Sequence, residues 1–126
     1  MRITSFILCE QATVRPDGTF DVVNGGLGEV LLSKFPGEPR VSAVLVIEFG
    51  PDETGPQALD IQLRDANARR LQMWRYPFTL ADNQRGANIA LNLKGLSLPE
   101  AGEYLLDARV NGRHLGPAKT LRASLG

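Results

Sequence analysis

A single histidine is the first residue to consider for catalysis. His114 follows the turn residues Asn111 and Gly112, and the nearest carboxylate with which it could pair is Asp107. A general base needs a nucleophile or a carboxylate fixed beside it. In the predicted register Asp107 faces outward, so we expect a surface histidine at the end of a hairpin and no catalytic residues.

The sequence also argues against a metal or cofactor site. Cys9 is the only cysteine, which excludes an internal disulfide and a cysteine-based zinc site, and one histidine cannot form a histidine-based one. Cys9 lies in an apolar run, where a thiol behaves as a small hydrophobic group. Calcium needs about six to eight oxygens from converging loops. We therefore interpret the acidic residues as solvated charges: Asp52, Glu53, Asp60 and Asp65.

A glycine-rich stretch, residues 24–28, invites comparison with a phosphate-binding loop. That fingerprint requires a third glycine at the opening of a helix, but Leu31 occupies this position and the following residues are typical of a strand. Asn24-Gly25 between apolar runs instead predicts a hairpin turn.

Two aromatic residues are the best candidates for binding a ligand. Trp74 and Tyr76 are two residues apart on a predicted strand and so share one face, with Met73 and Arg75 on the other. An exposed pair of rings would stack on a sugar or anchor a partner protein. The alternative is that both rings belong to the core or to a self-interface. Trp74, Arg75 and Tyr76 are the candidate contact residues.

The strands that position these residues alternate apolar and polar side chains. Leu59, Ile61 and Leu63 alternate with polar residues, as in a half-buried strand. Residues 41–49 are apolar on both faces, and Val44 and Val46 lie on the face opposite the core. We expect another segment of the chain, or a second copy of it, to cover Val44 and Val46, which makes them a candidate self-interface.

A corner near the C-terminus identifies the architecture. Pro99 and Gly102 break one strand, and Tyr104 opens the next, so that its hydroxyl is placed to bond back across the corner. This is the tyrosine corner of immunoglobulin-like sandwiches. With eight or nine expected strands and turn signals every 8 to 12 residues, the sequence predicts an all-β fold, a single antiparallel β-sandwich of immunoglobulin-like character.

Length and charge limit the classes of partner. The 126 residues suit one domain, residues 1–126, and a net charge of zero gives no field to attract nucleic acid. No apolar run approaches the roughly 20 residues that cross a bilayer. The first nine residues read as a strand and not as a secretion signal. We expect a cytoplasmic protein that binds neither nucleic acid nor membranes.

The chain resembles an uncharacterised bacterial family of small single-domain immunoglobulin-like β-sandwich proteins of unknown function. The resemblance is carried by residues 3–10 (Ile-Thr-Ser-Phe-Ile-Leu-Cys-Glu), by Asn24-Gly25-Gly26, and by residues 99–104 (Pro-Glu-Ala-Gly-Glu-Tyr). It covers most of the chain and rests on structural residues. It therefore implies a fold and no activity.

Two functions remain open from the sequence. The first is a non-catalytic module that presents sheet faces or edges to a partner protein or to another copy of itself, as a homo-oligomer. The second is a sandwich that binds a small molecule or carbohydrate on an aromatic surface. An enzyme would need a site assembled from loops, and the sequence offers no residue set for one.

Overall fold

The computed structural model describes residues 1–116 and 118–126, which form eleven β-strands. A small sheet has the strand order β1-β5-β8, and a large sheet has the order β4-β11-β9-β6-β7, with β10 paired to β9. The small sheet consists of β1 (Arg2–Cys9), β5 (Ser42–Glu48) and β8 (Gly86–Asn92). The large sheet consists of β4 (Glu29–Leu32), β6 (Gly55–Arg64), β7 (Arg70–Leu80), β9 (Gly102–Val110), β10 (Arg113–His114) and β11 (Lys119–Leu125). The remaining pair is β2 (Gln11–Val14) with β3 (Phe20–Val23).

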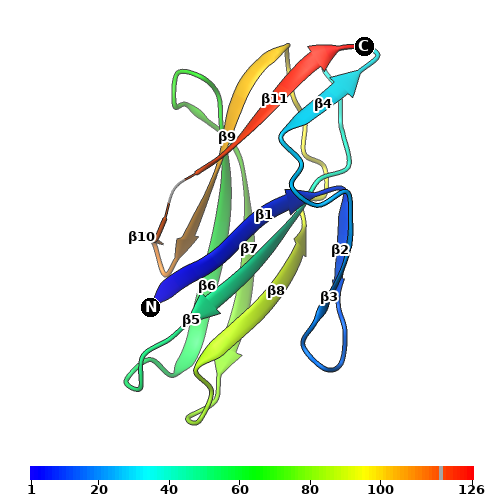
Figure 1. Cartoon of the computed structure of the whole chain (residues 1–126). Coiled ribbons are helices and arrows are strands. Elements are labelled where there is room, and N and C mark those ends of the chain that lie inside the picture. Colours follow the sequence, from blue (N-terminus) through cyan, green and yellow to red (C-terminus); the bar gives the residue numbers. More distant parts are fainter. Residues whose placement is uncertain (117) are drawn as a thin grey trace.

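The two sheets face each other as the layers of a sandwich, with the small sheet in front in Figure 1. The β2–β3 hairpin lies beside β8 and against the small sheet. The fold is therefore the all-β, immunoglobulin-like sandwich that the sequence predicts.

The core lies between the sheets and follows the predicted alternation. In β5 and its flanks, every second residue is no more than 5% exposed: Val41, Ala43, Leu45, Ile47 and Phe49. The same holds in the large sheet for Leu59, Ile61, Leu63, Tyr104, Leu106, Ala108 and Val110. Because side chains alternate across a pleated sheet, this pattern fixes which face of each strand packs inward.

The tyrosine corner forms as predicted. The hydroxyl of Tyr104 donates to the carbonyl oxygen of Glu100 at 2.6 Å and accepts from the Glu100 N–H at 3.2 Å. Tyr104 is only 2% exposed, so these bonds replace water at a buried polar group. The corner fixes the entry of the chain into β9, the central strand of the large sheet.

The predicted hairpin at Asn24-Gly25 is wrong. β3 pairs with β2, whereas β4 joins the large sheet, so the turn carries the chain from one sheet to the other. The actual hairpin turns at Pro16, Asp17 and Gly18 and uses a strand, β2, that the sequence analysis did not identify. Its first strand is only four residues long, which gives a weak pattern.

A turn prediction near the C-terminus is confirmed. Asn111 and Gly112 have φ angles of 52° and 79° and connect β9 to β10 by a two-residue loop. Positive φ at both central residues is the geometry that Asn-Gly favours in hairpins.

Pro77 lies within β7, which among the described residues pairs with β6 alone, and an edge strand tolerates a residue that lacks an N–H donor. One further expectation needs correction, because the pairing is not antiparallel throughout. β4 enters the large sheet by the crossover from β3 and runs parallel to β11.

Within residues 1–116 and 118–126, no helix is long and apolar enough to span a membrane.

Replacing Tyr104 by Phe removes both hydroxyl bonds to Glu100 while leaving the ring in the core. We expect a loss of about 1–2 kcal/mol in the free energy of unfolding, measured by urea denaturation. Tyr76→Phe is the matched control, since Tyr76 is 38% exposed and should tolerate the change. Equal stability of the two variants would contradict a structural role for the corner.

Candidate functional site

A groove runs along β1, at the side of the sandwich where the small sheet ends. Among the described residues β1 has only β5 as a strand partner, so its other edge faces the groove, where the Leu8 carbonyl accepts from the N–H groups of Gly26 and Leu27. One hollow of about 150 Å³ is lined by Ile3, Thr4, Ser5, Phe6, Ala108, Gly116 and Lys119. A second, of about 240 Å³, is lined by Phe6, Ile7, Leu8, Gly26, Leu27, Gly28, Lys119 and Thr120. The two share Phe6 and Lys119, and are therefore neighbouring parts of one groove.

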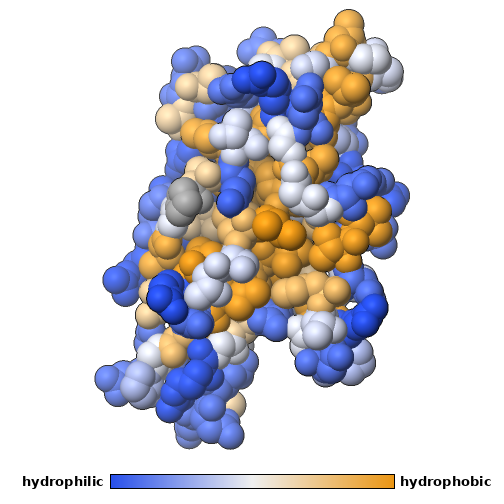
Figure 2. Space-filling view, in the orientation of Figure 1, coloured by the Kyte–Doolittle hydropathy of each residue, from blue (hydrophilic) through white to orange (hydrophobic). Residues whose placement is uncertain are grey.

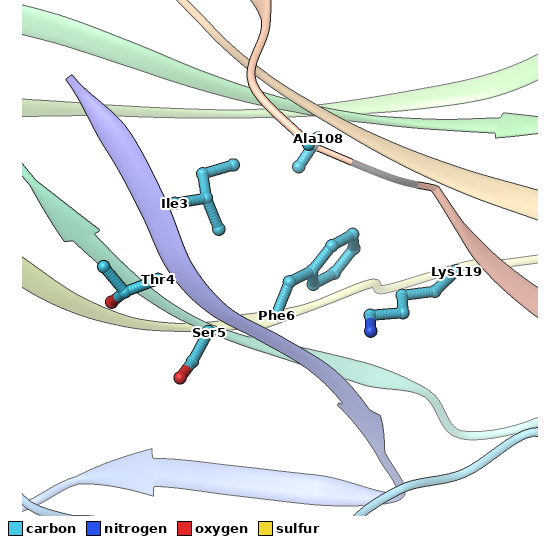
Figure 3. Close-up of a pocket in the computed structure, with 7 residues that line it drawn as sticks. Ile3, Thr4, Ser5, Phe6, Ala108 and Lys119 are labelled. Carbon is cyan, nitrogen blue, oxygen red and sulfur yellow. The ribbon is translucent and has the colours of Figure 1, made fainter.

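Lys119 is the charged residue of this groove. It pairs with Leu106 in register, and on β11 it alternates with Leu121 and Ala123, which are no more than 2% exposed. Lys119 is thus on the inward side of its strand, but at the open end of the sandwich. Figure 3 shows its side chain beside the Phe6 ring, with Ile3 and Ala108 around the same hollow. The sequence analysis missed this residue, although its alternation with Leu121 and Ala123 was a usable signal.

The surface around the groove is apolar. Figure 2 shows apolar residues gathered in the middle of the face that carries β1. Ile7, Val22 and Val23 are 37%, 39% and 50% exposed, and Ile3, Leu27 and Leu115 are partly buried against the core. Exposed apolar surface of this kind is typical of interaction sites.

His114 and Asp107 lie together on the outer face of the large sheet. His114 Nδ1 is 2.5 Å from Asp107 Oδ1, and Arg109 Nε is 3.1 Å from Asp107 Oδ2. The outward direction predicted for Asp107 is consistent with this contact. The histidine side chain is 51% exposed whereas that of Asp107 is only 7% exposed. The imidazole is therefore the more accessible member of this pair and lies against a nearly buried carboxylate.

Long arginine side chains cover the middle of this outer face. Arg75 Nε donates to Asp60 Oδ1 at 2.9 Å across the β6–β7 pair. Arg64 donates to Gln62 Oε1 at 2.5 Å. Asp60 and Gln62 are each 6% exposed, so this face is more buried than a simple in-and-out alternation predicts. The cover comes from neighbouring strands, which a single-strand pattern does not reveal.

The aromatic residues of β7 do not form one surface with Arg75. Trp74 is half-buried and donates its indole N–H to the carbonyl of Lys94 at 2.9 Å. Tyr76 stacks on Phe78 with 6.1 Å between ring centroids. Arg75 lies on the opposite face, where it pairs with Asp60. A ligand at Tyr76 would therefore meet one exposed ring rather than the full set of Trp74, Arg75 and Tyr76.

Val44 and Val46 differ in exposure. Val44 is 4% exposed and Val46 is half-buried. The β2–β3 hairpin lies against β5 and β8 on this side of the small sheet, and Asn88 donates to the Gly18 carbonyl at its turn at 2.7 Å. We expected either another segment of the chain or a second copy of it to cover Val44. The structure shows the first of these, since the hairpin of the same chain lies over this side.

The acidic residues weighed as calcium ligands have separate structural partners. Glu53 pairs with the N-terminal amine at 2.6 Å and accepts the Gly50 N–H at 2.8 Å. These bonds, that to the amine foremost, hold the pKa of Glu53 below its usual value. Asp65 accepts the N–H groups of Arg69 and Asn67, which lowers its pKa. Within the described part of the chain, no three metal-ligating side chains come together.

Comparison with known proteins gives a family and one distant structure. The model of a family of unknown function (DUF6941) matches residues 4–120. Among solved structures, an immunoglobulin-like protein from Pseudomonas aeruginosa aligns over 98% of this chain and 95% of its own. The identity is 14% and the TM-score is 0.42. No curated protein matches the chain significantly.

Cys9 should react slowly in the folded protein. It is fully buried, its thiol lies 3.5 Å from the Ser42 carbonyl oxygen, and burial raises its pKa. We expect iodoacetamide at pH 8 to modify it about a hundredfold more slowly than in the urea-unfolded chain, as followed by mass spectrometry. A second cysteine placed at the exposed Thr79 (Thr79→Cys) is the internal control and should react rapidly. Comparable rates at both positions would contradict the burial of Cys9.

Proposed function

The chain belongs to this family of unknown function, and we propose that it is a non-catalytic interaction module that accepts an extended segment of a partner protein along the free edge of β1. The observation that carries the proposal is the continuous groove beside that edge, with its two hollows sharing Phe6 and Lys119. A cytoplasmic location, in keeping with the single thiol Cys9, remains part of the proposal.

An edge strand supports this mode of binding because half of its backbone N–H and C=O groups have no strand partner. A peptide that adds to such an edge gains main-chain hydrogen bonds, and pockets for alternate side chains supply the specificity. β1 is eight residues long, with a bulge between Ile3 and Ser5, and its Leu8 carbonyl already accepts from Gly26 and Leu27, so a bound segment would pair with the edge groups that precede Leu8. The neighbouring strand of the other layer, β11, forms the opposite wall of the groove through Lys119 and Thr120.

The two hollows follow one another along β1. One hollow spans β1 from Ile3 to Phe6, and the other spans it from Phe6 to Leu8. In an added strand, every second side chain points the same way, and successive ones are about 7 Å apart. Two neighbouring inward side chains of a bound segment would therefore each enter one hollow.

The other edges of the sandwich are less suited to pairing. β7 also has a free edge, but it carries Arg70, Arg75 and Pro77, and arginine and proline at an edge oppose strand addition. β4 offers only four residues. β8 has the β2–β3 hairpin beside it. The apolar surface near β1, by contrast, includes the exposed Ile7.

Filling the groove should abolish peptide binding. Gly116 lines the first hollow, its φ is not positive, and a Cβ added there would meet no atom within 4 Å, so the backbone accepts a side chain and Gly116→Trp adds bulk at the hollow. We expect nonapeptides selected from a random phage-displayed library on the wild-type protein to lose at least tenfold in affinity on this variant, measured by fluorescence anisotropy.

Thr79→Trp, on the exposed far edge, is the matched control for added bulk, and circular dichroism checks the fold of both variants. Selected peptides that bind Gly116→Trp as tightly as the wild type would overturn the proposal. So would a selection that yields no peptide. Dimers of the free protein that Gly116→Trp disrupts would instead assign the groove to self-assembly.

A further inference from the structure

We propose that Lys119 recognises a carboxylate in the segment bound beside β1, so that the partner is an acidic side chain flanked by apolar ones in an extended peptide. This inference rests on the proposed function and specifies the chemistry of the peptide that binds in the groove. It starts from the position of a charged residue on the inward side of a core strand.

Lys119 lies at a position of β11 where the alternation of inward and outward side chains predicts an apolar residue. Its register partner Leu106 is fully buried, as is Leu121 two residues further along β11. Lys119 itself is half-buried, because the sandwich opens at this point into the groove. Its aliphatic stem lies beside the Phe6 ring, as Figure 3 shows, and its ammonium group lies at the groove. The charge is therefore held at the place where a bound strand would lie.

No carboxylate in the described part of the chain forms an ion pair with Lys119. The recorded ion pairs engage other acidic residues: Asp21, Glu48, Glu53, Asp60, Asp65, Glu103 and Asp107. Around Lys119 the groove wall is largely apolar, with Ile3, Phe6, Ala108 and Leu27. A partner strand that covers this wall also removes water from the ammonium, and an opposite charge offsets that loss better than a neutral acceptor does.

The position of Lys119 between the two hollows predicts the order of side chains in the bound peptide. Lys119 borders both hollows, so a carboxylate that reaches it from either hollow leaves the other hollow for the next inward side chain. Both hollows contain apolar wall residues. The expected motif is therefore an aspartate or glutamate with an aliphatic or aromatic residue two positions away.

A rival role for Lys119 makes the opposite prediction. An inward-pointing charge at a sheet edge can protect it from pairing with other chains. Its stem would then cover Phe6 while its ammonium reaches water. If Lys119 protects the edge in this way, removing its charge increases the binding of all peptides. If it recognises a carboxylate, removing its charge weakens the binding of acidic peptides only.

An array of alternating heptapeptides separates these roles. The probes have the form Thr-X-Thr-Z-Thr-X-Thr, where X is Val, Leu, Ile or Phe and Z is Glu, Asp, Gln, Asn or Lys. We expect acidic members to bind the wild-type protein about tenfold more tightly than their amide counterparts, as for a charge-assisted contact. Lys119→Met keeps the stem and should remove this preference, and Lys119→Glu should transfer it to the Lys peptides.

The possible failures are distinguishable. Equal binding of acid and amide peptides, still lost in Gly116→Trp, would overturn the role of Lys119 and leave the groove as the binding site. Tighter binding of all peptides by Lys119→Met would show that Lys119 protects the edge from pairing, and would overturn the inference. If no member of the array binds, both the inference and the proposed function fall.

Discussion

Burial of one face of each sheet against the other is the constraint on which this molecule depends. The inner faces of β5, β6 and β9 supply side chains that are almost completely inaccessible to water, and burial of such side chains is the main favourable term in folding. The two sheets are unequal in size, with three strands facing six. At the β1 side the layers do not close completely, and Phe6 and Lys119 line the groove between them. The groove is therefore a consequence of how this sandwich closes.

The outer faces of the two sheets are shielded from water in different ways. On the small sheet, the β2–β3 hairpin lies against β5 and β8, and Val44 is buried there although it points away from the core. On the large sheet, arginine side chains cover buried acids, as Arg75 does for Asp60. One face is covered by a hairpin of the same chain and the other by ion pairs. Among the edges of the sandwich, β1 therefore combines free backbone groups with apolar surroundings.

Several features could be predicted from local patterns. Alternation identified the buried residues of β5, β6 and β9, because period-2 burial is a property of each strand separately. The tyrosine corner at Tyr104 and the turn at Asn111-Gly112 were also predictable, since their bonds join residues close in sequence. The prediction at Asn24-Gly25 was wrong because a turn motif specifies a local backbone shape and not which strands pair.

The sequence by itself determined the all-β class, the inward faces of the main strands and the corner that orders β9, since these depend on propensity and on short-range contacts. Only the tertiary structure decided the pairing of β4 with β11, the covering of Val44, the contact of His114 with Asp107, and the groove at Lys119. Each of these joins segments from different strands. Their meeting depends on how two sheets pack and where they end, which no alternation within one strand encodes.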